Sequence, residues 1–388
     1  MNSLSKIGFL HTLLNLQYPV FFRFFIGFFY FLVCITISFD YKLSFLFFKR
    51  VLLRNDLKSE SRRLFWILKR KSLIIKESND FMFDFCNGLD FKELFVIKSF
   101  FMKSINTHVE NIYVELDLLK ILAYEINFIF DNKPNEILFE KFKDQYFKVK
   151  KILNKKNIQK HQILKINKNK FSKKNSGISS KNAQKVLFDL NHLFKRNKIE
   201  WFPISGTFLG FIREKSFLAH DLDIDIGLIS NEESFERVKD ILKKNHIFKI
   251  SKIEYQKYFL NKNNYFKRPN FARIIHKNGI NIDLYFHYVI GNSIFHGTSS
   301  ILWENTLFEL SNYKIYGILI KGPDNSDLYL SETYGDWKNE KIDYDFHRDM
   351  LSLKGAPNHL GLEYLLRRKL YCGKDPKEQI SKIEKLIF

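Results

Sequence analysis

The sequence predicts an α+β (mixed α/β) protein, with a mixed sheet flanked by helices and a mainly helical N-terminal region before it. Two observations indicate this class. The first 145 residues carry apolar side chains at helical spacing, and the chain after residue 183 alternates short helical and strand-like stretches. A length of 388 residues accommodates both parts. We therefore divide the chain into residues 1–145, a Lys-rich linker at 146–182 and a domain at 183–388.

The composition is basic and rich in phenylalanine. The formal net charge is +21, and 42 of the residues are Phe. A basic balance favours anionic partners such as nucleic acid, a membrane surface or phosphorylated substrates. Codon bias in an AT-rich genome accounts for the abundance of Phe, Lys, Asn and Ile, so the Phe content by itself does not indicate a binding surface.

Three cysteines, Cys34, Cys86 and Cys372, are far apart in the sequence. No pair has the spacing of a metal site, and the odd number does not suggest a secreted disulfide scaffold. We expect a reducing compartment and no zinc site built on cysteine.

An apolar segment covers about residues 19–39, and residues 24–39 carry no charge. The latter would extend roughly 24 Å as a helix, slightly less than a hydrocarbon core of about 30 Å. Three interpretations stay open: a helix at the membrane interface or packed on the following helices, a single spanning helix, and a buried strand pair. A spanning helix would leave the C-terminal bulk in the cytoplasm, because Lys and Arg follow it.

The next two stretches differ in charge. Residues 56–144 read as helices with apolar stripes, and nothing in them indicates catalysis. Residues 145–188 contain no Asp or Glu and many lysines, which is typical of a solvated linker. Attachment to an anionic membrane leaflet is the functional alternative. Phe171 is the only aromatic residue in the middle of this stretch, so we expect no nucleic-acid partner.

The chain from Val186 onward has a regular order of elements. An amphipathic helix is expected up to Lys198, a short strand at 199–204, and a turn at 205–207 followed by a short apolar element. Residues 223–229 then alternate apolar and polar side chains, and 281–286 repeat that pattern. Both are predicted strands.

Asp223 and Asp225 fall on the same face of their strand, opposite Ile224, Ile226 and Leu228. Two carboxylates on one face of a largely apolar strand are costly unless a cation lies between them. A hard divalent cation with oxygen ligands, Mg²⁺ or Mn²⁺, is the expected occupant.

Five further positions complete the predicted site: one adds a third carboxylate, and the other four are candidate phosphate contacts. If the two strands are neighbours, Asp283 joins the metal ligands and helps to deprotonate an attacking hydroxyl. Gly206 and Thr207 would let a phosphate approach the backbone. Arg213 and Arg273 are candidates for bidentate phosphate contacts.

The segment SGTFLGFIREKSFLAHDLDIDIGL resembles the signature of the LicD/fukutin family, and Tyr334-Gly335-Asp336-Trp337 resembles its YG-W element. The likeness covers residues 186–349. It implies a nucleotidyltransferase-like fold and an Asp223, Asp225 and Asp283 metal site. It also implies transfer of phosphocholine or a polyol phosphate, such as ribitol phosphate, from a CDP-linked donor to a glycan.

The chain departs from many bacterial members of that family just before the metal ligands. Leu222 stands where an acidic residue is usual and His220 where an aromatic one is, so the donor and acceptor are open. Asp221 is expected to support the metal ligands from behind or to lie in a loop, and not to be a ligand itself.

We therefore predict a metal-dependent phosphotransferase of lipopolysaccharide or capsule biosynthesis, cytoplasmic and at the inner face of the membrane. The membrane contact would run through residues 19–39 and the basic linker. Three alternatives stay open. They are a metal-dependent glycosyltransferase that uses a nucleotide-sugar, a degenerate, membrane-associated interaction protein, and an RNA nucleotidyltransferase, for which the sequence shows no recognisable RNA-binding module.

Overall fold

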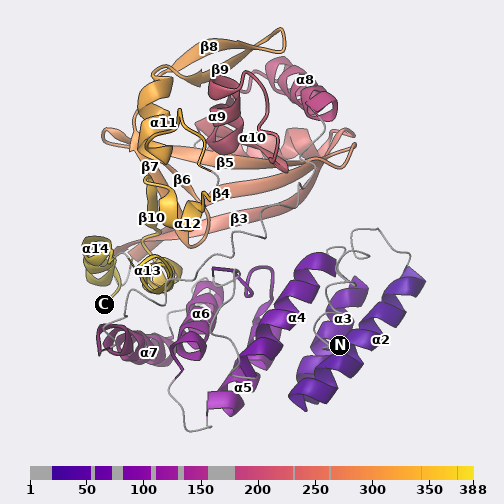
Figure 1. The fold of residues 1–388 in the computed structure, drawn as a ribbon, viewed down its shortest axis with the longest axis vertical. Coiled ribbons are helices and arrows are strands. Elements are labelled where there is room, and N and C mark those ends of the chain that lie inside the picture. The colour runs from indigo at the N-terminus through magenta and orange to yellow at the C-terminus, as the bar shows by residue number, and fades with distance from the viewer. Residues whose placement is uncertain are drawn as a thin grey trace. The chain divides into compact units, whose positions relative to one another are not determined.

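The computed structural model describes residues 20–53, 57–71, 82–105, 111–129, 135–155, 180–229, 232–261, 264–341, 343–373 and 375–388. The chain divides into two compact units, Met1–Leu164 and Lys165–Phe388. Figure 1 shows the first as helices and the second as a mixed sheet with helices, so the predicted fold class is confirmed.

The described part of the first unit is helical, as the apolar spacing predicts. Its helices are α2 (Val20–Ser38), α3 (Tyr41–Leu53), α4 (Leu57–Lys71), α5 (Phe91–Ile105), α6 (Ile112–Ile129) and α7 (Glu136–Lys155). Helices α2 and α3 pack side by side, and α6 packs on α7.

A buried network of charges ties three of these helices together. Arg50 of α3 donates to both oxygens of Glu60 on α4, at 2.6 and 2.7 Å, and also to Glu93 on α5. Arg63 of α4 donates to the same Glu60 and to the carbonyl of Phe85. Removing one partner of such a network would leave an uncompensated buried charge. The network therefore fixes how α3, α4 and α5 pack.

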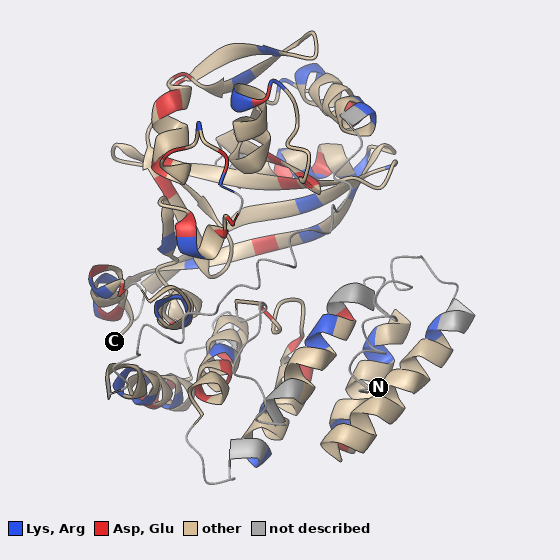
Figure 2. Cartoon of the chain, in the orientation of Figure 1, with Lys and Arg blue, Asp and Glu red and all other residues tan. Residues whose placement is uncertain are grey.

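Residues 20–38 form a single helix, so the strand-pair interpretation of this segment is wrong. Figure 2 shows α2 almost free of charged residues. Among the described residues, no helix is long and apolar enough to cross a membrane. Helices α2 and α3 expose several large apolar side chains, namely Phe24, Phe25, Phe28, Phe29, Leu32, Ile37, Tyr41, Phe45 and Leu53.

The predicted linker begins too early. Helix α7 continues to Lys155, so residues 146–155 are helical and not part of a connector. Apolar side chains at helical spacing, such as Tyr146, Val149 and Ile152, are buried in this stretch and hold it in the first unit. Residues 156–179 lie outside the described part of the chain.

The second unit is built on an eight-stranded sheet with the order β1-β2-β5-β6-β7-β10, and β4 and β3 extend from β5. Among the strands that the structure describes, β2 and β5 alone pair in parallel, and the other pairs of this sheet are antiparallel. The strands are β1 (Phe202–Pro203), β2 (Asp223–Ile229), β3 (Phe248–Asn261), β4 (Asn264–His276), β5 (Asn281–Ile290), β6 (Ser293–Gly297), β7 (Ile301–Thr306) and β10 (Leu353–Gly355). Strands β8 (Leu310–Ile315) and β9 (Ile318–Pro323) form a separate hairpin.

Helices cover this sheet and complete the unit. They are α8 (Ser180–Arg196), α9 (Ser205–Arg213), α10 (Glu232–Lys243), α11 (Ser326–Tyr334), α12 (Phe346–Asp349), α13 (His359–Cys372) and α14 (Lys377–Ile387). The apolar sides of α8 and α10 share one buried core with Ile224 and Ile226 of β2 and Ile282 and Leu284 of β5. The alternate residues of β2 and β5 therefore face away from this core.

Candidate active site

The parallel pairing of β2 and β5 brings three aspartates together. Asp225 lies directly opposite Asp283, and Asp223 lies opposite Asn281 one pleat away. Neighbouring strands are about 4.8 Å apart, so the carboxylates of Asp225 and Asp283 share one face of the sheet. The two strands are therefore neighbours, which is the condition for Asp283 to join Asp223 and Asp225 in one site.

Burial and mutual repulsion make negative charge costly here. Burial raises the pKa of Asp225 well above its usual range, and the charges of Asp223, Asp283 and Asp221 raise it further. Burial is also the main reason that the pKa of Asp223 is raised, followed by the charge of Asp283. The site therefore carries an excess of negative charge that a cation would relieve.

Arg273 on β4 supplies one cation from the chain itself. Its Nε and Nη2 donate to the two oxygens of Asp283, at 2.6 Å each, and Nη2 lies 3.7 Å from Asp223 Oδ2. The antiparallel register places Arg273 directly opposite Asp283. The carboxylates in turn raise the pKa of Arg273. The structure thus places this arginine inside the carboxylate cluster, with its side chain 39% exposed.

The predicted turn at Gly206 and Thr207 is wrong, because both residues lie in the first turn of α9, which begins at Ser205. Ser205 has a left-handed φ of 49°, and the chain turns there from β1 into α9. Thr207 is fully buried, and its hydroxyl accepts a hydrogen bond of 2.9 Å from the backbone N–H of Asp225. Thr207 therefore helps to position β2, the strand that carries Asp223 and Asp225.

Asp221 lies at the same helix start, a position that no sequence pattern predicts. A Cβ atom on Gly206 would lie 2.9 Å from Asp221 Oδ2, so glycine allows this carboxylate to approach. Within the described residues, that buried oxygen has no hydrogen-bond partner. Burial and the charge of Asp223 raise the pKa of Asp221 to about 7. Its position two residues before Asp223 is the only sequence signal for it.

Arg213 ends α9 and points to another element of the signature. It donates to Glu214 at 2.7 Å and to the backbone carbonyl of Trp337 at 3.2 Å. Tyr334 is partly buried, and desolvation raises its pKa well above the usual range, with a smaller contribution from the charge of Asp225. Arg213 therefore ties the end of α9 to the Tyr334–Trp337 segment, which lies beside the carboxylates.

Comparison with known sequences agrees with this arrangement. Residues 198–325 match the family described as LicD/FKTN/FKRP, nucleotidyltransferase domain. The second unit carries a LicD-family domain.

Two uncharacterised bacterial proteins are similar to this chain. One, from Rickettsia typhi, is 25% identical over 181 residues, which cover 44% of this chain and 52% of that protein. The other, from Rickettsia prowazekii, is 24% identical over 180 residues, which cover 44% of this chain and 61% of that protein. The chain thus spans about half of the length of the first relative and about three fifths of the second.

The LicD domain offers the oxygen ligands that a hard cation prefers, although one of the carboxylates, Asp283, is paired with Arg273. Among the described residues, no group of three or more His, Cys, Asp or Glu side chains is arranged to hold a metal ion. Asp283 gives both of its oxygens to Arg273. The chemistry of the cluster nevertheless fits, because carboxylate oxygens are the ligands that Mg²⁺ and Mn²⁺ prefer and their charge is otherwise poorly balanced.

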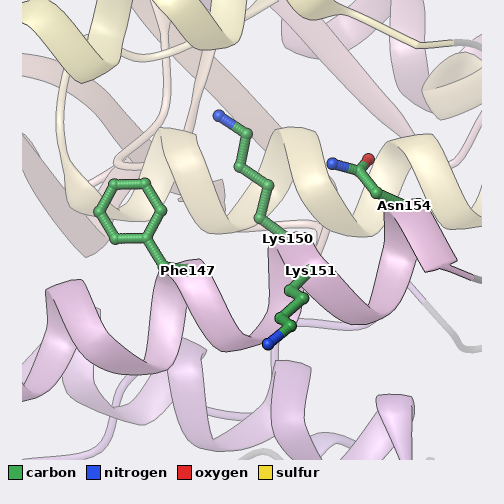
Figure 3. Close-up of a pocket in the computed structure, with 4 residues that line it drawn as sticks. All are labelled: Phe147, Lys150, Lys151 and Asn154. Atoms are coloured by element: carbon green, nitrogen blue, oxygen red, sulfur yellow. The ribbon is translucent and has the colours of Figure 1, made fainter.

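A hollow elsewhere in the chain does not compete with this site. It lies along α7, has a volume of about 400 Å³ and is lined by Phe147, Lys150, Lys151 and Asn154 (Figure 3). It contains none of the predicted site residues, and its lining carries no carboxylate. The aspartate cluster of the LicD domain therefore stays the candidate active site.

Proposed function

We propose that the LicD domain is a metal-dependent phosphotransferase that moves phosphocholine or a polyol phosphate from a CDP-linked donor to a hydroxyl of a cell-surface glycan. The observation that carries the proposal is the in-register pair Asp225 and Asp283, with Asp223 on the same face. Three carboxylates with an excess of negative charge suit the transfer of a phosphoryl group held by a divalent cation.

Asp223, Asp225 and Asp283 would hold Mg²⁺ or Mn²⁺ in this proposal. The metal would neutralise charge on the phosphoryl group and lower the pKa of the attacking hydroxyl. Asp283 must first release Arg273, whose guanidinium then becomes available to a phosphate oxygen of the donor. Arg273 would thus neutralise the carboxylates before the donor binds and a phosphate of the donor afterwards.

The start of α9 is the proposed phosphate cradle. Gly206 and Thr207 are in its first turn, where backbone N–H groups lack partners within the helix and the helix dipole favours an anion. Thr207 uses its hydroxyl to hold Asp225, so its backbone N–H, and not its side chain, would meet the phosphate. Arg213 is proposed as a further phosphate contact beside the Tyr334–Trp337 segment.

We further propose that the chain works in the cytoplasm at the inner face of the membrane, where lipid-linked glycans are available. The exposed rings of α2 and α3, among them Phe24, Phe25 and Phe45, support a peripheral contact, and the basic stretch after α7 supports attraction to anionic lipid. Flotation of the purified chain with anionic and with neutral vesicles tests this. A chain that stays at the bottom of both gradients would rule out the membrane contact.

Donor specificity tests the enzymatic proposal. The full chain is incubated with CDP-choline, CDP-glycerol, CDP-ribitol and a panel of nucleotide-sugars, with Mg²⁺, Mn²⁺ or EDTA. We expect metal-dependent release of CMP from at least one CDP-alcohol. Release of a nucleotide only from a nucleotide-sugar would instead assign the glycosyltransferase alternative. No turnover of any donor, with intact folding, would favour the interaction protein.

A further inference from the structure

The hairpin of β3 and β4 carries a second polar cluster, formed by Arg268, Gln256 and Asn270. Arg268 is 8% exposed, Asn270 1% and Gln256 0%. Arg268 and Gln256 lie directly opposite each other in the antiparallel pair. The register then shifts, so that Asn270 has no opposite residue in β3. A β-bulge of this kind re-aims a side chain and is common beside functional sites.

Several polar atoms of this cluster are buried without a partner. Among the described residues, no hydrogen bond reaches Arg268 Nε or Nη2, Gln256 Nε2 or Oε1, or Asn270 Oδ1. Buried polar groups of folded proteins are almost always hydrogen-bonded, so five such atoms in one cluster require an explanation. Asn270 uses its amide nitrogen on the carbonyl of Gly297, at 2.9 Å, which fixes its oxygen in the cluster.

The free edge of Arg268 has the geometry of an anion receptor. Nε and Nη2 are the same two nitrogens that Arg273 places on the two oxygens of Asp283. A guanidinium presents this edge to a carboxylate or a phosphate in a bidentate contact. Aromatic rings hold the Arg268 guanidinium in place, with its carbon 3.6 Å from the centre of the Tyr288 ring and 4.2 Å from that of Tyr258. The donors are thus oriented before any ligand binds.

Strand pairing relates the cluster to the rest of the hairpin. Lys252 lies opposite Arg273, and Glu254 lies opposite Phe271, before the bulge. Beyond the bulge, Arg268 contacts the ring of Tyr288, which shares a buried core with Ile282 and Leu284. At about 3.3 Å per residue, Arg268 lies roughly 15 Å along β4 from Arg273. The cluster is therefore a site separate from the aspartates.

We propose that Arg268, Gln256 and Asn270 form a binding site for an oxyanion, the carboxylate or phosphate group of an acidic sugar. The guanidinium edge binds the anion, and the Gln256 and Asn270 amides bind hydroxyl groups next to it. Binding needs neither the metal nor the donor of the proposed transfer.

Calorimetric titration of the full chain with three probes tests the site. The probes are glucuronate, inorganic phosphate and neutral glucose, all in EDTA. We expect at least one anion to bind and glucose not to bind. Glucuronate alone would point to a carboxylate-bearing glycan, and phosphate to a phosphorylated one. If neither anion binds, or if glucose binds as well as they do, the proposal is overturned.

Variants locate the binding on the cluster. Arg268→Met should weaken anion binding by about tenfold or more, because a charge-assisted bidentate contact is lost. Arg268→Lys keeps the charge but loses the bidentate donor edge of the guanidinium. It replaces the methionine variant in this test if that variant does not fold. The matched control is Lys267→Met, which removes the same charge from the exposed neighbour on the other face of β4. Equal binding by the wild type and a folded Arg268 variant would overturn the proposal.

A second comparison separates this site from the reaction. Asp223→Asn should retain anion binding while it loses metal-dependent CMP release. A chain that binds the anion but turns over no donor would refute the phosphotransferase and leave the anion site standing. Clearly tighter anion binding in Asp223→Asn would show that the anion lies beside the aspartates, because a repelling carboxylate has been removed, and would overturn the assignment to Arg268.

Discussion

Asp225 and Asp283 lie directly opposite each other on the parallel strands β2 and β5. This one register joins two parts of the sequence that are far apart and puts two carboxylates on one face of the sheet. Burial and repulsion make negative charge on these carboxylates unfavourable, and several of the predictions below follow from that.

The first prediction concerns the aspartates as metal ligands. Asp223→Asn, Asp225→Asn or Asp283→Asn should each lower metal-dependent CMP release by about a hundredfold or more, because a metal ligand is lost. The Asp225 variant should also melt at a higher temperature at neutral pH, since it removes a carboxylate whose pKa is raised. Exposed Asp240→Asn on α10 is the control. A triad variant with near-normal release would remove that residue from the site.

The second prediction concerns competition between Arg273 and the metal for Asp283. Arg273→Met should lower the stability of the chain in EDTA by about 1–2 kcal/mol, a value reduced because this ion pair is partly exposed. It should also tighten Mn²⁺ binding, because no guanidinium has to be displaced. Chemical denaturation and a Mn²⁺ titration followed by electron paramagnetic resonance measure the two effects.

Lys249→Met, an exposed change of the same charge on β3, should alter neither quantity. Mn²⁺ affinity that falls or stays constant in Arg273→Met would mean that the arginine and the metal do not compete.

The third prediction is the pH dependence that Asp221 imposes on stability. Its pKa is about 7 in the folded chain, raised mainly by burial and then by the charge of Asp223, against 3.8 for an unperturbed aspartate. Between these values the folded state binds more protons, so the contribution of Asp221 is favourable at low pH and is lost as pH rises through 7. Asp221→Asn should therefore be more stable than the wild type at pH 8, by on the order of 2–4 kcal/mol, and almost equal to it at pH 4.

Urea denaturation in EDTA at pH 4, 6 and 8 measures that difference. Asp240→Asn, an exposed aspartate, should show no trend with pH. A stability gain of Asp221→Asn that is the same at all three pH values would contradict a raised pKa.

The fourth prediction concerns Thr207. Thr207→Val keeps the shape of this buried residue but removes the oxygen that accepts from the Asp225 N–H, and should cost about 1–3 kcal/mol. Thr207→Ser keeps the hydroxyl and should recover most of that loss. Urea denaturation of the three proteins provides the measurement. Equal stability of the valine and serine variants would show that the hydroxyl does not hold β2.

The sequence alone predicts much of the catalytic surface because strand periodicity is local. Alternation puts Asp223 and Asp225 on one face, and the same pattern makes Asp283 a candidate. The Gly206-Thr207 segment is harder to predict. Its short apolar run fits a turn or a helix, and the tertiary hydrogen bond between Thr207 and Asp225 favours α9.

Long-range pairing decides what the sequence cannot. Arg273 becomes part of the site only because β4 pairs with β5 at that register. Arg268 has no motif around it, and its interest arises from burial and unpartnered atoms that exist only in the folded chain. The helix that replaces the first part of the predicted linker likewise depends on side chains that become buried in the first unit.

The sequence by itself therefore determined the fold class, the aspartates of the candidate metal site and the family likeness that the domain match supports. These rest on local periodicity and on short motifs, which neighbouring residues specify. Only the tertiary structure decided that Asp225 faces Asp283, that Arg273 neutralises them and that Asp221 and Arg268 are buried. Such relations depend on strand register and burial, which bring together residues that the sequence keeps apart.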